Sequence, residues 1–422
     1  MKRRNFIAAA SGGVSALMAS SGLSQEKKEQ PKPAQRSSSG IVLKGITWGT
    51  SRGYCPLVAT SKRFEETHPG VKIYWERENY DFAQGNLEET AKVYDIMMID
   101  HPHVGSAATR KFLVPLDDYL PAAYLKDQAD NSVGKSHISY SYNGKQWGLA
   151  TDAATPVAFY RPDLMEKFKA EIPKTWEDVI ELAKKKLAVF PCDPISNLMN
   201  FFMFCSTLKG NMFPDDKTVV DEDTGVKALR YMRDLAVLMS DEIYKLGTSP
   251  THEFLISQDN VAYCPFTYPY CNYSRRGYGR KVLVFADIVT LGNNGILHST
   301  LGGAGLSVSA TSQNRETAIE YIAYATSPEI QSSLYFEAGG QPGHRKAWLD
   351  DTNNMLSNNF FKNTLKSHDN SYLRPTYHKY LYFQGKGGVP IKEYLMKGGN
   401  EKDVLNAITD LYKESKAMEK KG

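Results

Sequence analysis

Strand-like and helix-like segments alternate from Ile41 onward, and this alternation constrains the fold more than any other feature of the sequence. Apolar periodicity and Gly/Pro punctuation predict, in order, a buried strand (41–50), a helix (56–70), a second strand (71–77), a helix (about 82–92) and a third strand (94–99). Strands joined by helices in this way predict an α/β fold built on a parallel sheet with crossover connections.

The middle of the chain adds a hairpin and longer helical segments. Asn143-Gly144 between two β-rich runs predicts a tight hairpin, and Thr175 has the position of an N-cap for a helix over 175–185. Later segments predict helices in DPISNLMNFFMFCSTLKG and TGVKALRYMRDLAVLM, then strands in NVAYCPF and KVLVFADIV. After the glycine-rich stretch Gly302–Gly305, the chain is mainly helical to its end, and it contains no internal repeat.

Composition restricts the class of partner. The 422 residues, 41% of them hydrophobic, are enough for two domains of ordinary size or one large one. The formal charge of +4 comes largely from the first 24 residues, which hold three basic side chains and no acidic one. The remainder is almost balanced, so nothing in the charge predicts nucleic acid or an anionic membrane as a partner.

The N-terminus predicts export from the cytoplasm. Residues 1–24 combine a basic start with a short stretch of small, moderately apolar residues, which is typical of a signal segment and too short for a convincing membrane span. Arg3-Arg4 and the residues after it resemble the twin-arginine export motif, while an ordinary secretory leader with a chance arginine pair is the alternative. Residues 25–40 are charged, then serine-rich, and predict a disordered tether. We therefore expect a periplasmic or otherwise extracytoplasmic protein.

Five cysteines are too few for a disulfide framework, and none belongs to a C-x-x-C motif. Small buried side chains are the simplest interpretation, but in an oxidising compartment either Cys264 with Cys271 or Cys192 with Cys205 has a spacing that permits a bond. The first cysteine is Cys55, so a lipid anchor next to the signal segment is not expected.

The apolar run YDIMMI ends abruptly in Asp100-His101-Pro102-His103. Because these side chains directly follow a parallel strand, they belong at the sheet edge where the loops of α/β folds bind ligands. Three interpretations stand: contact with a polar ligand, a structural loop in which Asp100 caps the next helix, and a metal site. Pro102 between the histidines and the lack of any accompanying metal motif count against the metal.

The ordered segments resemble a known family. They are the opening strand with Trp48-Gly49, SKRFEETHPGVKI, YDIMMIDHPHVGSAATRKFLVPLDDYL, the YNGKQWGLATDAATPVAFYRPDL to PKTWEDVIELAK block, DNVAYCPFTYPY, and GGAGLSVSATSQNRETAIEYIAYATSPEIQ. Together they resemble extracytoplasmic solute-binding proteins of ABC importers, in the carbohydrate-binding group that includes maltose-binding protein. The resemblance implies two α/β lobes joined by crossing strands near 150–156 and 302–305, with a ligand cleft between them.

The same resemblance implies lobe boundaries and a function. The first lobe would consist of 41–150 and 303–345, and the second of 151–302 and 346–422. The protein would capture a sugar or oligosaccharide by lobe closure and deliver it to a membrane permease, as a monomer without cofactor or catalysis.

Site residues follow from the resemblance together with position at strand ends. In the family the DHPH loop supplies polar contacts to sugar hydroxyls, which fits a carboxylate and neutral imidazoles. Aromatic rings stack on the apolar faces of sugars, and Phe266 occupies the family's tryptophan position. The full set of expected ligand-binding residues is Trp48, Arg52, Tyr54, Asp100, His101, His103, Asp152, Phe266, Tyr268, Tyr270, Gly303 and Gln341.

Two other classes of function stay open at this point. An exported hydrolase would use Asp100, His101 and His103, with Asp152, but the sequence has no nucleophile elbow and no H-E-x-x-H motif. A binding protein of the same fold would instead take ferric iron or an organic anion. Relatives that bind iron use an adjacent tyrosine pair, and this sequence has no Tyr-Tyr dipeptide.

Overall fold

The computed structural model describes residues 40–78 and 86–421, so the expected export signal and nearly all of the tether lie outside the described residues. Five strands form the first sheet in the order β2-β1-β3-β10-β6: Val71–Glu78, Ile41–Trp48, Ile96–Ile99, Gly302–Val308 and Leu149–Ala154. Strand β1 pairs in parallel with β2 and β3, as the sequence predicts. The sheet is not parallel throughout, because β10 returns from the second half of the chain and runs antiparallel to both β3 and β6.

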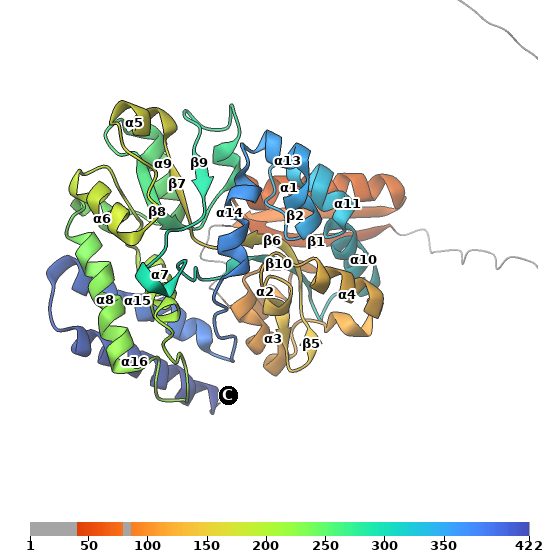
Figure 1. Ribbon diagram of the computed structural model, residues 1–422. Coiled ribbons are helices and arrows are strands. Elements are labelled where there is room, and N and C mark those ends of the chain that lie inside the picture. The colour runs from red at the N-terminus through yellow and green to blue at the C-terminus, as the bar shows by residue number, and fades with distance from the viewer. Residues whose placement is uncertain (1–39, 79–85, 422) are drawn as a thin grey trace, which may run out of the picture. The chain divides into compact units, whose positions relative to one another are not determined.

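Helices cover this sheet, and they gather around it in Figure 1. They are α1 (Ser51–Thr67), α2 (Leu87–Thr90), α3 (Val104–Arg110), α4 (Ala122–Asp130), α10 (Arg315–Ala325) and α11 (Pro328–Ile330). The first helix begins five residues before the predicted start at Pro56, because the Thr50 side chain caps it by accepting from the Gly53 amide. The described part of the helix expected over about 82–92 is the single turn α2.

A smaller antiparallel sheet, in the order β8-β7-β9, forms a second centre of packing: Tyr263–Thr267, Val157–Tyr160 and Val284–Ala286. The helices associated with it are α5 (Pro162–Lys167), α6 (Trp176–Lys184), α7 (Pro194–Thr207), α8 (Glu222–Ala236), α9 (Thr248–Ser257), α12 (Arg345–Leu349), α13 (Asp351–Leu356), α14 (Phe360–Asp369), α15 (Tyr380–Lys397) and α16 (Glu401–Glu419). The predicted helices in the segments of α7, α8 and α16 are confirmed. Figure 1 shows α7, α8, α15 and α16 packed beside one another, in agreement with their mutual contacts.

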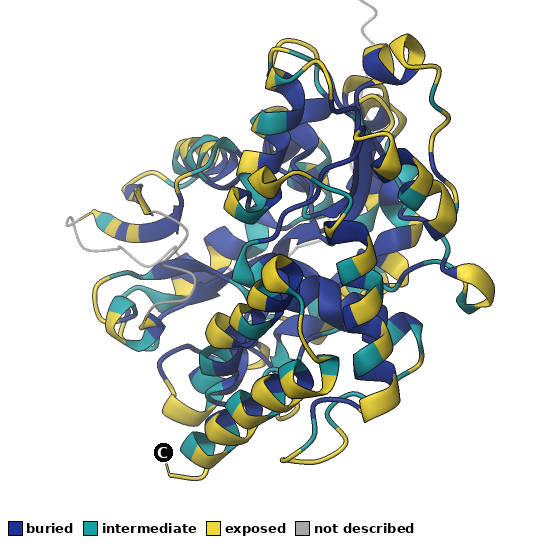
Figure 2. Ribbon diagram, turned by 90° about the vertical axis from the view of Figure 1, so that its left-hand side faces the viewer, coloured by how far each residue is buried: buried dark blue, intermediate teal, exposed yellow. Residues whose placement is uncertain are grey.

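Two separate hydrophobic clusters define what we call the first and second lobes. The first cluster surrounds the five-stranded sheet, with members from Leu43 to Ala150 and from Ala304 to Tyr335. The second holds nearly all the buried apolar residues from Ala153 to Leu297 and from Phe336 to Tyr412. In Figure 2 most of the strand residues are dark blue and the outer faces of the helices carry yellow, which is the pattern of amphipathic helices packed on largely buried sheets. The lobe boundaries expected from sequence stay a prediction.

Local predictions based on turn and cap chemistry are confirmed. Strands β4 (Ser141–Tyr142) and β5 (Lys145–Gln146) flank Asn143 and Gly144, which both have positive φ (50° and 73°), as a tight hairpin turn requires. Thr175 caps α6 in a capping box with Asp178. All five cysteines are free, so neither candidate disulfide is formed. No helix within 40–78 and 86–421 is long and apolar enough to cross a membrane.

Candidate functional site

Asp100 lies directly after β3, at the sheet edge predicted from the sequence, and its carboxylate faces an arginine from the other lobe. The Arg374 Nη2 donates to Asp100 Oδ1 over 2.7 Å, and both side chains are largely buried. The backbone of Asp100 begins the short 3-10 helix His101–His103, but its side chain makes no capping bond. The interpretation of Asp100 as a helix cap is therefore wrong, because the carboxylate is engaged by the stronger charge-assisted bond.

Arg374 was not anticipated from the sequence, although every one of its contacts is specific. Its Nε donates to the Leu301 carbonyl over 3.0 Å, and its Nη1 donates to Gln384 Oε1 over 2.7 Å. The residue lies in the segment between α14 and α15 of the second lobe, and it reaches the first lobe at Asp100. In the sequence Arg374 is simply an arginine before Pro375, in a stretch without hydrophobic periodicity. Such a stretch does not reveal that its partner is Asp100, 274 residues away.

The charges around Asp100 determine its protonation state and that of His101. Burial alone would raise the pKa of Asp100, but the neighbouring Arg374 charge, aided by His101, holds that pKa well below its usual range. Burial, reinforced by Arg374, lowers the pKa of His101 to about 4. At neutral pH the site therefore contains an ionised Asp100 and an uncharged His101.

A second buried ion pair joins Arg52 and Asp152. Arg52, in the first turn of α1, binds the carboxylate of Asp152 with two nitrogens, of which Nε donates to Oδ2 over 2.7 Å. Its Nη1 donates to the Pro269 carbonyl over 2.6 Å, and its guanidinium lies 4.9 Å from the centre of the Tyr270 ring. Burial raises the pKa of Asp152 even with Arg52 beside it. This group of contacts links α1, the crossing strand β6 and the loop after β8.

The expected aromatic residues lie in different environments. Tyr268 follows β8, and its hydroxyl donates to the Thr300 carbonyl over 3.1 Å. Trp48 ends β1 and is buried, with 8% of its surface exposed. Tyr54 lies under the guanidinium of Arg77, whose carbon is 5.3 Å from the ring centre.

Phe266, in contrast, packs inside the second lobe. It is 1% exposed and contacts three other aromatic rings of the hydrophobic cluster, Trp176, Phe190 and Phe204. Its ring is parallel to that of Trp176, with centroids 6.5 Å apart. These contacts give Phe266 the environment of a core residue. Tyr268, two residues further along the chain, is an aromatic residue that lies near Asp100 and Arg374.

Gln341 and Gly303 both contact the backbone where the chain passes between the lobes. The Gln341 Oε1 accepts from the Cys271 amide over 3.0 Å, and its Nε2 donates to the Ala153 carbonyl over 2.6 Å. Gly303 has a φ of +95°, and a Cβ at this position would lie 2.4 Å from the Asp152 carbonyl oxygen. Only glycine fits both the left-handed backbone and this close approach.

Two polar atoms at this site are buried without a hydrogen-bond partner among the described residues. They are His101 Nε2 and the hydroxyl of Tyr380, a residue close to Arg374 and Asp100. His103 lies on the same 3-10 helix as His101 and is 2% exposed. Within the described part of the chain, no cluster of three or more His, Cys, Asp or Glu side chains is arranged to hold a metal ion.

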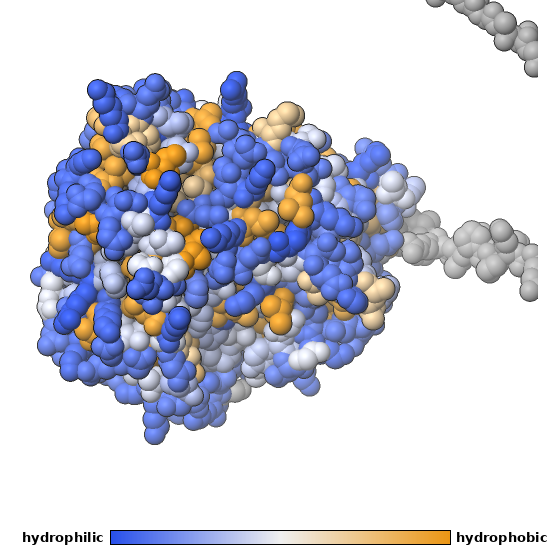
Figure 3. Space-filling view, in the orientation of Figure 1, coloured by the Kyte–Doolittle hydropathy of each residue, from blue (hydrophilic) through white to orange (hydrophobic). Residues whose placement is uncertain are grey.

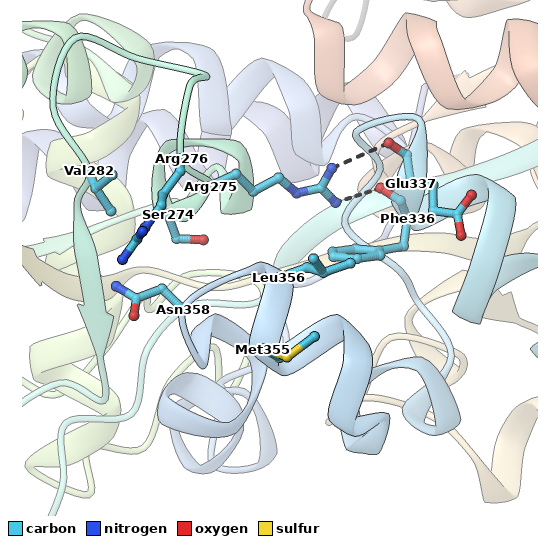
Figure 4. Close-up of a pocket in the computed structure, with 9 residues that line it drawn as sticks. All are labelled: Ser274, Arg275, Arg276, Val282, Phe336, Glu337, Met355, Leu356 and Asn358. Atoms are coloured by element: carbon cyan, nitrogen blue, oxygen red, sulfur yellow. Dashed lines mark hydrogen bonds between the residues drawn. The ribbon is translucent and has the colours of Figure 1, made fainter. Parts of the chain in front are cut away.

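A hollow of about 680 Å³ lies apart from this site (Figure 4). The Arg275 guanidinium packs 3.9 Å from the Phe336 ring centre and donates to the carbonyls of Phe336 and Glu337. The other residues that line the hollow are Ser274, Arg276, Val282, Met355, Leu356 and Asn358. None of the residues expected to bind ligand lines this hollow. On the face shown in Figure 3, hydrophilic residues make up most of the surface and apolar residues lie in separate small groups.

Comparison with known proteins identifies the family. Residues 59–354 match the sequence pattern of the bacterial extracellular solute-binding proteins. The chain belongs to this family. Among curated proteins, this solute-binding protein is 25% identical over 221 residues to the arabinooligosaccharide-binding protein of Bacillus subtilis (strain 168), an alignment that covers 48% of the chain and 49% of the relative. It spans about half the length or less of the curated relatives it matches.

Solved structures show the same fold over nearly the whole chain. The GacH receptor of Streptomyces glaucescens, studied unliganded and with acarbose, is 18% identical with a TM-score of 0.74, covering 90% of this chain and 99% of that one. Maltose-bound MalE3 of T. maritima is 18% identical with a TM-score of 0.76, covering 89% and 100%. The two-lobe α/β fold expected from the sequence is thereby confirmed.

Proposed function

We propose that this protein captures a sugar or oligosaccharide outside the cytoplasm by closure of its two lobes and delivers it to the permease of an ABC importer. The observation that carries the proposal is the charge balance at the strand ends. Two carboxylates, the buried Asp152 and the largely buried Asp100, are each neutralised by an arginine, with Tyr270 beside Arg52 and Tyr268 near Arg374. An uncharged site with hydrogen-bonding groups and flat rings suits a neutral, polyhydroxylated ligand.

The names of similar proteins support the same ligand class. The curated relative is described as binding arabinooligosaccharides, and the two solved structures contain maltose or acarbose. The ligand-binding residues we propose include Trp48, Asp100 and His101, at the ends of strands β1 and β3, and Tyr268, directly after β8. Phe266 no longer belongs to this set, because its ring is enclosed by the second core.

The other ligand classes fit less well. An organic anion needs an unpaired cation, whereas Arg52 and Arg374 are each occupied by a carboxylate. Ferric iron prefers carboxylate and phenolate oxygens, and both carboxylates of the site are bound to arginines. A hydrolase needs a group that exchanges a proton near neutral pH, whereas Asp100 stays ionised in its pair with Arg374 and burial lowers the pKa of His101 to about 4.

Calorimetric titration tests the ligand class. We expect heat of binding with at least one member of a panel of maltose, malto-oligosaccharides and arabino-oligosaccharides, unaffected by a chelator. Tyr268→Ala is expected to weaken binding roughly tenfold or more, because a stacking surface and a polar contact are lost. Tyr74→Ala, which changes a tyrosine that is 58% exposed on β2, is the matched control and keeps the affinity. Binding of an organic acid or a metal with no response to any sugar would refute the carbohydrate assignment.

Export is tested separately from binding. The proposed signal at residues 1–24 lies outside the described residues, and its twin-arginine character depends on Arg3 and Arg4. With both changed to lysine, precursor is expected to accumulate in the cytoplasm while the purified protein keeps its fold and affinity. Unimpaired export of this double variant would favour the ordinary secretory pathway.

A further inference from the structure

The ring of His101 lies between two charged groups that make opposite demands on its Nδ1 atom. Arg374 Nη2 is 3.3 Å from Nδ1, and Asp100 Oδ1 is also 3.3 Å from it. A guanidinium only donates hydrogen bonds, so Nδ1 has to accept if it bonds to Arg374. An ionised carboxylate only accepts, so Nδ1 has to carry the proton if it bonds to Asp100.

The geometry favours Arg374 as the partner. The Arg374 Nη2 group forms a hydrogen bond with Nδ1, whereas Asp100 Oδ1 contacts the same atom at the same distance as the partner in an ion pair. Asp100 Oδ1 already accepts from the same Nη2 over the shorter distance of 2.7 Å. A proton on Nδ1 would also face the N–H of Arg374, which is repulsive.

With Nδ1 as an acceptor, the proton of the neutral ring is on Nε2. That atom is buried and has no hydrogen-bond partner among the described residues. The Tyr140 ring lies edge-on to the His101 ring, at an interplanar angle of 86° and with the ring centroids 6.2 Å apart. The Tyr140 hydroxyl donates to the Ile99 carbonyl. A buried donor left without an acceptor is unfavourable, and a ligand oxygen is the group that can satisfy it.

We propose that Arg374 is a positioning residue that fixes the tautomer of His101, so that the Nε2–H group donates to an oxygen of the bound sugar. This inference rests on the proposed function only for the identity of the ligand. Arg374 comes from the second lobe and His101 from the first, so the contact that sets the donor joins the two lobes.

The test is ¹⁵N NMR of the full chain with labelled histidine at neutral pH, without ligand. Protonated and unprotonated ring nitrogens have very different chemical shifts, and His101→Gln identifies the signals of this residue among the nine histidines. We expect the unprotonated signal from Nδ1 in the wild type and in Arg374→Lys, which keeps a donor. In Arg374→Leu the proton is expected to move to Nδ1, since Asp100 is then the only charged neighbour.

Asp100→Asn provides the discriminating variant, and it also serves if Arg374→Leu does not fold. If Arg374 sets the tautomer, Nδ1 stays unprotonated in Asp100→Asn; if Asp100 sets it, the wild type carries the proton on Nδ1 and Asp100→Asn loses it. A protonated Nδ1 in the wild type, or an unchanged tautomer in folded Arg374→Leu, overturns the proposal.

Sugar titration supplies the second readout. In the wild type, binding is expected to shift the Nε2 resonance, and His101→Phe, which keeps the ring but not the donor, is expected to weaken binding by about tenfold or more. An unchanged Nε2 resonance on sugar binding refutes the contact with ligand. If no sugar binds to the wild type, the proposed function fails, while the tautomer measurement still decides the role of Arg374.

Discussion

At the scale of single residues, the charged side chains of the site stabilise each other rather than contacting water. Arg52 and Asp152 are both at least 96% buried as side chains, and Arg52 also donates to the Pro269 carbonyl. Isolated charges in such surroundings would be strongly unfavourable, so the pair is stable only as a pair. The same reasoning applies to Asp100 and Arg374.

A double-mutant cycle measures this dependence. We expect Arg52→Met to lower the free energy of unfolding by roughly 3–5 kcal/mol, because Asp152 is left as an uncompensated buried charge. The double variant with Asp152→Leu is expected to cost much less than the sum of the two single changes. Urea unfolding supplies the free energies, and Arg63→Met, which removes an exposed pair with Glu66, is the control and is expected to leave the stability nearly unchanged. Additive costs at Arg52 and Asp152 would contradict the coupling.

At the scale of elements, the crossing strands β6 and β10 are closely packed against each other. Their register shifts between Ala304 and Gly305, and the backbone of Gly303 lies against that of Asp152 and Ala153. Asp152, the acidic residue of the second ion pair, therefore lies directly beside Gly303 in the paired strands. A change at Gly303 affects both strand pairing and the position of Asp152.

Two glycine substitutions separate a constrained glycine from an unconstrained one. Gly303→Ala is expected to destabilise the protein by at least about 1–2 kcal/mol and to weaken ligand binding, since the added Cβ strains a positive φ and meets the Asp152 carbonyl. Gly385→Ala in α15, where a Cβ would meet nothing within 4 Å, is expected to stabilise it by about 0.5–1 kcal/mol. Thermal unfolding measures the stability of both variants. The same change in stability for Gly303→Ala and Gly385→Ala would contradict the constraint that we assign to Gly303.

At the scale of the whole molecule, buried histidines make stability depend on pH. Burial lowers the pKa of His101 and of His368 to about 4 and that of His252 to about 3, from an ordinary value of 6.5. The folded protein therefore binds fewer protons than the unfolded chain between about pH 6.5 and these values. Its free energy of unfolding has to fall as the pH falls through that window.

Between pH 7 and pH 5 we expect each of these three histidines to lower the free energy of unfolding by roughly 1–2 kcal/mol. The decrease is observed as a falling midpoint of urea unfolding. His252→Phe is expected to reduce this slope, because the new ring fits the stack with Phe159 and Tyr273 but does not titrate. Phe159→Leu loosens the same stack and keeps the histidine, so it is expected to lower stability while the pH dependence persists. A slope that is the same in His252→Phe and the wild type would contradict this account.

The class of fold, the succession of strands and helices, the hairpin at Asn143-Gly144 and the cap at Thr175 could be predicted from the sequence, because they depend on local hydrophobic pattern and turn chemistry. The sequence also places Asp100 and His101 at a strand end. The direction of β10, the enclosure of Phe266 in the second core, and the pairing of Asp100 with Arg374 and of Asp152 with Arg52 became visible only in the folded chain. These partners are 274 and 100 residues apart, and no local pattern encodes which charge meets which when two lobes pack together.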